Sequence, residues 1–193
     1  MRHSTKAALC LLVAALAVPA AWATLAVERT EADLIQDADV IVTGHCSQVQ
    51  SQWVDRDLVT LATIQVSEVL KGQAGAQVTV VLPGGVDANR PVPIAMSFPG
   101  APEISQQEDV LLFLTSEDRV ANGYAIVGWS QGKFSLVDNP QSGQKMATQD
   151  LGALNLQGRD GALRRGSVKT FPLAQLRQKI QQTLAVEKPE RPR

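Results

Sequence analysis

Hydrophobic and polar residues alternate with a period of two through much of the middle of this chain. In the segment 58–70 one parity carries Leu58, Thr60, Ala62, Ile64, Val66 and Leu70. Alternation of this kind predicts a strand rather than a helix. Its thirteen residues at about 3.3 Å each would extend roughly 43 Å, about twice a typical strand. A strand of this length is expected to bend around a barrel or to serve two sheets.

Shorter apolar runs predict further strands around this one. They lie at 40–43, which opens into a polar hairpin at 47–52, at 78–82, at 110–114, and at 124–129 and 133–137. The run 110–114 is apolar on both parities and indicates a strand covered on both faces. The last two runs are expected to pair as a hairpin across residues 130–132. Four prolines in 87–105 favour a long, partly extended loop, whose strands are short or lie at an edge.

Two helices are predicted, one near each end of the segment 24–186. Thr30 followed by Asp33 has the spacing of a capping box, which indicates a short helix. Residues 141–169 show little periodicity and are expected to form an irregular connection. A second helix is predicted over 170–186, with Thr170 as N-cap, Pro172 in the first turn, and an apolar stripe of Leu173, Leu176, Ile180 and Leu184. Residues 187–193 are expected to form a tail.

Residues 1–23 have the pattern of a secretory signal peptide. Arg2, His3 and Lys6 precede an apolar run from Ala7 to Ala20, and small residues at Ala21 and Ala23 suit signal-peptidase cleavage before Thr24. We therefore expect export to the periplasm or the extracellular space of a bacterium, without stable membrane insertion after cleavage. Cleavage would also remove Cys10, which leaves Cys46 without an internal disulfide partner.

The remaining polar residues do not form a recognisable catalytic, cofactor-binding or metal-binding pattern. His45 and Cys46 are neighbours on a predicted strand, so their side chains should point to opposite faces. Gly128–Gly132 matches the GxSxG pattern of hydrolases, but a strand-like run follows it and His45 precedes it, so Ser130 is predicted in a turn. The same stretch lacks the residue count and the hydroxyl of a phosphate loop. No cofactor and no metal are expected.

Carboxylates and tryptophans supply the other candidates for a site. Asp55, Asp57, Glu68, Asp87, Glu108 and Asp109 could furnish an acid–base pair, although each is predicted at a hairpin end or turn, where solvated charge is normal. Trp53 and Trp129 could serve as platforms for a sugar or a peptide, and core or rim packing is the simpler interpretation of both.

Charge is divided unevenly along the 193 residues, although the formal total is only −1. Residues 24–140 carry 6 basic and 15 acidic side chains, a net of −9, whereas residues 141–193 carry 10 and 4, a net of +6. The basic end is expected either to fold back on the acidic body or to contact an anionic surface such as membrane lipid. The balanced total argues against a nucleic-acid partner.

The order of short phrases resembles that of a group of exported bacterial proteins. The phrases are ADVIVTG, TLATIQVSEVLKG, QVTVVLPGG, PGAPEISQQEDVLLFL and YAIVGWSQGKFSLV, and they cover roughly residues 32–138. More remotely, a strand ending in VLKG is similar to the netrin-type module of metalloprotease inhibitors, which implies an OB-type barrel. Those inhibitors use an N-terminal cysteine and several disulfides, whereas this chain has Thr24 and only Cys46 after cleavage.

We therefore expect a mainly β protein: a small OB-like barrel or β-sandwich of five to seven strands over 24–140, with a short N-terminal helix and a C-terminal amphipathic helix. The expected function is non-catalytic binding of a protein or extracellular ligand, through a surface or through the loop 87–105. The alternatives are an inhibitor or regulator of a secreted protease and a hydrolase built on carboxylates such as Asp55, Asp57 and Glu68.

Overall fold

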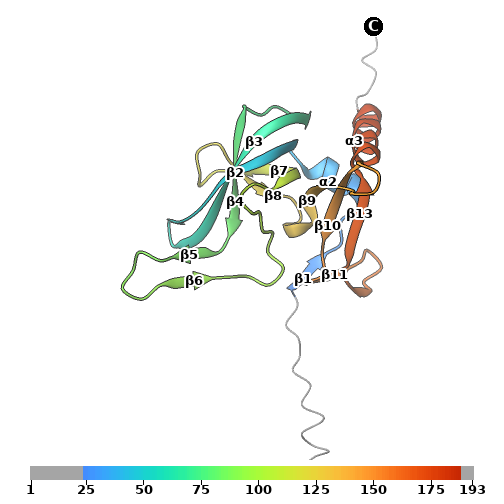
Figure 1. Cartoon of the computed structure of the whole chain (residues 1–193). Coiled ribbons are helices and arrows are strands. Elements are labelled where there is room, and N and C mark those ends of the chain that lie inside the picture. The colour runs from blue at the N-terminus through green and yellow to red at the C-terminus, as the bar shows by residue number, and fades with distance from the viewer. Residues whose placement is uncertain (1–23, 188–193) are drawn as a thin grey trace, which may run out of the picture.

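The computed structural model describes residues 24–187, and the predicted signal peptide 1–23 lies outside these residues, as does the predicted tail beyond Glu187. The described chain is mainly β, as the alternation predicts, with two α-helices (Figure 1). It contains thirteen strands, nine of them within residues 24–140, where five to seven were predicted. Strands of three or four residues account for much of the difference, because a strand of that length is too short to show an alternating pattern.

One sheet of eight strands forms the main body. Its order is β13 (Val168–Pro172), β10 (Lys145–Asp150), β9 (Lys133–Asp138), β7 (Asp109–Glu117), β2 (Val40–Val54), β3 (Asp57–Lys71), β4 (Gln77–Pro83) and β8 (Gly123–Ile126). The predicted long strand is therefore confirmed as β3. Its antiparallel pairing with β2 is interrupted by three register shifts, and such bulges bend a hairpin and increase its twist.

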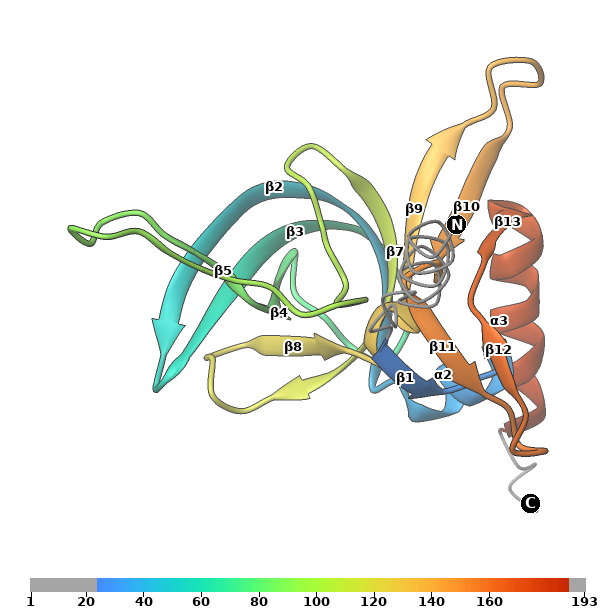
Figure 2. The ribbon, with the colours of Figure 1, turned by 90° about the horizontal axis from the view of Figure 1, so that it is seen from below.

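The sheet turns back on itself at β8 and makes a partial ring, which Figure 2 shows from below. β8 pairs in parallel with β4 at Thr79↔Gly123 and Val80↔Tyr124. It also pairs antiparallel with β7, from Leu114↔Ile126 to Glu117↔Gly123. The strands β2, β3, β4, β8 and β7 thus follow one another around the ring.

The predicted hairpin between 124–129 and 133–137 does not form. β8 and β9 instead lie one after the other along the same edge of β7, where β8 pairs with residues 114–117 and β9 pairs with residues 110–112. A short 3-10 helix, η1 (Trp129–Gly132), separates them. Two adjacent runs with a turn between them fit either arrangement, so periodicity alone could not distinguish a hairpin from a broken strand.

The prediction of an irregular connection over 141–169 is wrong. This stretch holds β10 and part of β13, together with β11 (Leu154–Gln157) and β12 (Leu163–Arg165). β11 lies between β1 (Thr24–Val27), with which it is parallel, and β12, with which it is antiparallel. These three strands form a separate small sheet. Every residue of β12 is exposed, so its sequence carries no alternation by which it could have been recognised.

Both predicted helices exist, although one begins later than expected. α2 (Glu31–Asp37) has the predicted capping box, with Thr30 and Asp33 each accepting a hydrogen bond from the other's backbone N–H. α3 spans Leu173–Glu187, and Thr170 lies in β13 opposite Thr148 rather than at the helix N-cap. The backbone pairs with β10 through Pro172, so the sheet continues through the residues predicted to start the helix.

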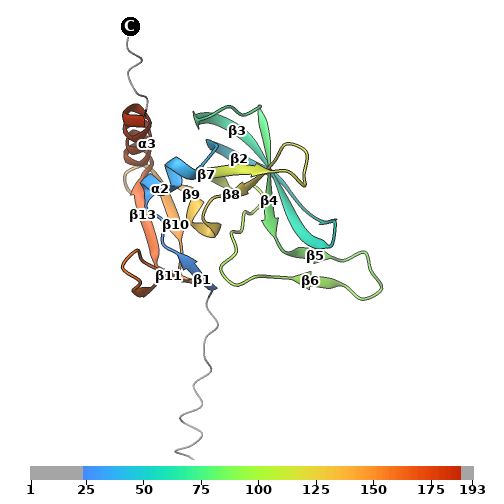
Figure 3. The same cartoon turned by 180° about the vertical axis from the view of Figure 1, so that it is seen from behind.

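The two helices and the inside of the ring enclose separate cores. Under the helices, the fully buried Phe113 and Phe134 pack with Leu34, Ile35 and Ile180. Inside the ring, Ile64, Val80, Leu112 and other aliphatic residues pack with Cys46. Figure 3 shows α2 and α3 together on one side of the molecule and the ring on the other.

The Pro-rich stretch is confirmed as a long extension with short strands. β5 (Gly85–Asp87) and β6 (Ile94–Met96) pair as a two-stranded arm that projects away from the ring (Figures 1 and 3). The indole Nε1 of Trp53 on β2 donates to the carboxylate of Asp87 at 2.8 Å, and the Arg90 guanidinium lies 5.0 Å from the Trp53 ring centroid. Trp53 therefore anchors the base of the arm.

Within residues 24–187, the two helices are too short or too polar to span a bilayer.

Candidate functional site

Three surface hollows meet at the segment 97–105, which connects the arm to β7. All three are lined by Phe98 and Pro102, and their volumes are about 480, 290 and 350 Å³. Phe98 keeps 44% of its surface exposed. The loop 87–105, which its prolines indicated as a candidate binding loop, thus carries a concave surface. Side chains from several elements converge on this surface.

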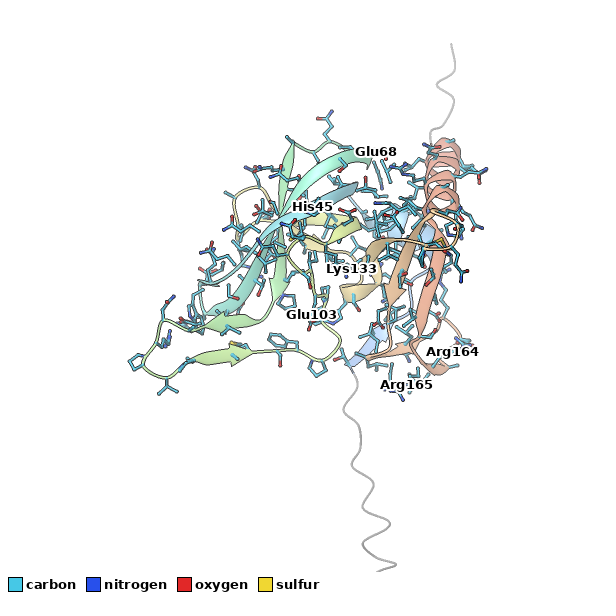
Figure 4. All side chains as sticks on the ribbon, in the orientation of Figure 1. His45, Glu68, Glu103, Lys133, Arg164 and Arg165 are labelled. Atoms are coloured by element: carbon cyan, nitrogen blue, oxygen red, sulfur yellow. The ribbon has the colours of Figure 1, made fainter. Side chains whose placement is uncertain are left out.

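The largest hollow, here called the polar hollow, lies between the segment 97–105 and the strands β9 and β10. Charged and hydroxyl side chains form much of its wall, namely Glu103, Ser130, Lys133, Ser135 and Asp150. Figure 4 labels Lys133 on β9 and Glu103 on the segment that faces it.

Lys133, Glu108 and Ser135 form a compact cluster at this wall. The Lys133 ammonium donates to Glu108 Oε1 at 2.6 Å and to Ser135 Oγ at 2.7 Å, and the Ser135 hydroxyl donates to Glu108 Oε1 at 2.7 Å. Burial alone would raise the pKa of Glu108, but the hydrogen bonds from Lys133, the Ser105 backbone and Ser135 outweigh it and lower this pKa. Glu108 is therefore a charged, partly buried anchor rather than the solvated carboxylate expected from its place near a turn.

The direction of these hydrogen bonds argues against a serine–lysine nucleophile. A lysine that activates a serine must be neutral and accept the hydroxyl proton. Here the Lys133 amine donates to Ser135, and the hydroxyl proton is directed to the Glu108 carboxylate. The cluster can position a ligand group by hydrogen bonding.

Replacing Lys133 by methionine should lower the free energy of unfolding by about 2 kcal/mol at pH 7, because it leaves a partly buried carboxylate without its cation. The Glu108 pKa is depressed below its ordinary 4.5, so its contribution is present above that pH and is lost as pH falls through the folded-state value. Urea titrations of both proteins at pH 7 and pH 3 should show the difference shrinking in acid. An equal difference at both pH values would contradict this assignment.

The second hollow, here called the apolar hollow, opens against the ring. Its apolar lining includes Leu58, Val59, Val81, Pro83, Ile126 and Trp129, and the charged Asp57, Glu117 and Arg119 also line it. Trp129 has φ +66°, a left-handed conformation that is costly for a bulky residue. Its indole Nε1 is buried and has no hydrogen-bond partner among the described residues, which leaves Trp129 strained and incompletely satisfied at the site.

The third hollow, here called the arm hollow, lies between the arm and the ring. Leu82, Met96, Ile104 and the backbone around Gly84 and Gly85 line it. The close approach of arm and ring depends on these glycines, because a Cβ on Gly84 would lie 2.5 Å from the carbonyl oxygen of Met96. The three hollows therefore form a series along one segment, with Phe98 and Pro102 between them.

His45 and Cys46 lie on opposite faces of β2, as alternation requires. The Cys46 thiol is fully buried in the ring core, and burial raises its pKa. His45 lies at the surface, where its ring nitrogens are 2.8 Å from Asp109 Oδ1 and 3.0 Å from Gln107 Oε1. Lys145 Nζ donates to the other Asp109 oxygen at 3.0 Å. The described residues contain no group of three potential metal ligands.

The hydrogen bonds to Asp109 and Gln107 raise the pKa of His45 above its ordinary 6.5. The contribution of this histidine to stability is therefore fully present below pH 6.5 and is lost as pH rises through its folded-state pKa. In the chain beginning at Thr24, His45 is the only histidine, so its imidazole proton resonances can be titrated by NMR without assignment. The midpoint should lie above 6.5 and should fall in Asp109→Asn, and an unchanged midpoint in that variant would contradict the assigned contact.

The other sequence candidates do not converge. Asp55 lies in the β2–β3 turn, Asp57 pairs with Arg119 at one end of β3, and Glu68 pairs with Arg177 of α3 near the other end. Asp87 is held by Trp53 and Arg90. The carboxylates named for an acid–base mechanism are thus divided among the β2–β3 hairpin, the arm and the start of β7.

The GxSxG stretch forms a junction rather than a nucleophile turn. Ser130 lies in η1 and is followed by β9, not by a helix. Gln131, which is 1% exposed, was not among the residues predicted from the sequence. Its side-chain amide donates to the carbonyls of Val27 and Gly128, and its oxygen accepts from the backbone N–H of Arg29. The sequence signal for this residue was its place in a turn between Gly128 and Gly132.

The basic C-terminal part folds back on the acidic body, which was the first of the two charge interpretations. Arg159, Arg164, Arg177 and Lys179 pair with Asp33, Glu28, Glu68 and Glu31, respectively. Part of the charge asymmetry seen in the sequence is therefore used within the molecule.

No protein-family model matches the chain, and no curated protein is significantly similar to it. The fold and the hollows together define a mainly β protein with a partial ring and a concave surface around Phe98.

Proposed function

We propose that this chain is an exported, non-catalytic binding protein that holds an extended segment of a partner polypeptide along Phe98–Pro102. The observation that carries the proposal is the convergence of three hollows on these two residues. Each hollow, at about 290 to 480 Å³, has room for at least one amino-acid side chain, and an extended peptide presents successive side chains to such a series. An apolar hollow beside a polar one would select an apolar and a polar residue in order.

Binding without catalysis is supported by the contacts of Lys133, Glu108 and His45. Lys133 and Glu108 neutralise each other through a hydrogen bond that also engages Ser135. His45 is engaged with Asp109 and lines none of the three hollows. A group committed to a partner in this way must break an existing contact before it can transfer a proton.

We propose further that the partial ring is an OB-like barrel. Its strand sequence around the ring is β2, β3, β4, β8, β7, with parallel pairing only between β4 and β8. Five strands in this order, closed by one parallel contact, support the barrel over a sandwich. OB-type barrels bind ligands across one face and its loops, and the segment 97–105 would take that place here.

Trp129 fluorescence offers a direct test, after Trp53→Phe makes it the only tryptophan of the chain beginning at Thr24. Peptides selected from a displayed random library on immobilised protein should change the Trp129 emission on titration. Phe98→Ser should weaken their binding at least tenfold, whereas the matched control Val92→Ser, exposed on the same loop but lining none of the hollows, should bind as before. Equal binding by both variants, or a library that yields no binder, would overturn the proposal.

An inhibitor or regulator of a secreted protease stands as a second candidate. Thr24, the first residue after the predicted cleavage site, donates its hydroxyl to the carbonyl of Pro99. With cleavage before Thr24, the chain terminus would therefore lie beside the hollows, although Thr24 stands where netrin-type inhibitors have a cysteine. Slowed hydrolysis of a peptide substrate by a secreted metalloprotease, relieved by Phe98→Ser, would favour this candidate.

A further inference from the structure

The charged side chains that line the three hollows do not balance. The polar hollow has Glu103, Asp150 and Lys133 in its wall, and the arm hollow has Glu103. The apolar hollow has two carboxylates and one guanidinium, those of Asp57, Glu117 and Arg119. Each hollow therefore has one more acidic than basic side chain in its lining.

Both basic side chains are already paired within the molecule. The Lys133 ammonium lies 2.6 Å from Glu108 Oε1, and only 17% and 19% of these two side chains are exposed. Arg119 donates to Asp57 Oδ2 at 2.8 Å and to Glu117 Oε1 at 3.0 Å. Among the described residues that line the hollows, an acidic side chain of a partner would therefore find no cation without a carboxylate of its own.

Glu103 and Asp150 have no such counterpart. No ion pair within residues 24–187 includes either side chain. Asp150 Oδ1 accepts the backbone N–H of Gly152 at 2.9 Å, a contact that leaves the charge of the carboxylate uncompensated. Glu103 belongs to the segment 97–105 and Asp150 is the last residue of β10. Two separate parts of the chain thus contribute unpaired negative charge to the polar hollow.

The rest of the polar hollow suits an aliphatic chain. Phe98, which is 44% exposed, lines it together with Leu151, Ala153 and Leu154. Lysine and arginine have long aliphatic stems that cover apolar surface while the charged head reaches a polar partner, and their cations are attracted to an aromatic face. A metal ion would use neither feature, and the described residues hold no group of three side chains that could bind one.

We propose that the partner segment places a lysine or arginine side chain in the polar hollow and an apolar side chain in the apolar hollow. This assignment rests on the peptide-binding function proposed above and adds the chemistry of the partner. The aliphatic stem lies along Phe98, and the cationic head pairs with Glu103 and Asp150. Both hollows have Phe98 and Pro102 in their walls, so the basic and the apolar residue lie close together in the partner's sequence.

Peptides selected from a displayed random library test the charge of the partner. They should share a lysine or an arginine, and its replacement by the uncharged norleucine or citrulline should weaken binding by about tenfold, as expected for loss of a charged hydrogen-bonding group. Glu103→Gln/Asp150→Asn should weaken binding of the basic peptide by a similar factor. The same variant should bind the uncharged peptide within about twofold of the wild type, because the two changes remove the same contact. Isothermal titration calorimetry measures each affinity.

Asp55→Asn/Asp138→Asn is the matched control. It removes two exposed carboxylates that line none of the three hollows, and its net charge equals that of Glu103→Gln/Asp150→Asn. The control should bind the basic peptide within about twofold of the wild type, because exposed charges at a distance are screened by salt. Circular dichroism spectra of both variants exclude loss of fold as the reason for weaker binding.

A basic partner would be contradicted by peptides that bind through Phe98 without a shared lysine or arginine, or by equal weakening in the test and control variants. Either result leaves the peptide-binding function itself standing. Enrichment of acidic residues would instead assign the polar hollow to a contact with Lys133. A library that yields no binder would refute both the peptide-binding function and the basic partner.

Discussion

Gln131→Ala should lower the free energy of unfolding by about 3 kcal/mol. The substitution removes three hydrogen bonds made by one buried amide. It leaves the backbone N–H of Arg29 and the carbonyl of Val27 without these partners, and each unsatisfied buried group costs about 1 to 3 kcal/mol. Gln131 also connects the segment between β1 and α2 to the break between β8 and β9, so the loss affects two parts of the fold.

Thermal unfolding followed by circular dichroism should show this effect as a midpoint lower by about 6 to 12 °C for a chain of this size. Gln141→Ala is the matched control, because Gln141 is exposed, and it should change the midpoint by no more than about 1 °C. A stability of Gln131→Ala equal to that of the control would show that the junction does not depend on this amide.

Ile180→Ala should lower the free energy of unfolding by about 3 kcal/mol, the usual cost of such a truncation in a packed core. Ile180 is fully buried on α3, in the cluster with Leu173 and Leu176. Gln181→Ala changes the next residue of the same helix, which is exposed, and should be nearly neutral. Urea titration of the three proteins measures the difference.

High salt distinguishes the contribution of apolar packing from that of ion pairs in the docking of α3. Its ion pairs, Arg177–Glu68 and Lys179–Glu31, are partly exposed, and pairs of this kind contribute roughly 0 to 1 kcal/mol and are screened by salt. The buried stripe is not screened, so 1 M NaCl should leave α3 docked. Release of α3 in 1 M NaCl would show instead that the ion pairs contribute more to its docking than the buried stripe does.

The sequence predicted those elements whose residues repeat a pattern for long enough. β3 alternates over its full length and α2 carries both halves of a capping box, and both form as expected. β12 is three exposed residues, too short for a period to appear. The start of α3 was misplaced because Thr170 and Pro172 satisfy the local preferences of a helix N-terminus, while pairing with β10 extends the strand through them.

The candidate site was predictable only as a loop. Prolines marked residues 87–105, but nothing in their order indicated that Phe98 and Pro102 would lie against three different walls. The cluster of Glu108, Lys133 and Ser135 joins residues from two parts of the chain through the register of β7 with β9. Such a contact depends on strand order, which single-sequence periodicity does not contain.

The position of β7 bears on how the chain can be divided. This strand pairs with β2 and β8 in the ring and with β9 outside it, so a cut after residue 140 would remove β10 from β9 and strip α3 from Phe134 and Phe113. The predicted boundary at 140 therefore runs through a shared core. Genetic fusions and truncations should respect a single indivisible unit from Thr24 to the last turn of α3.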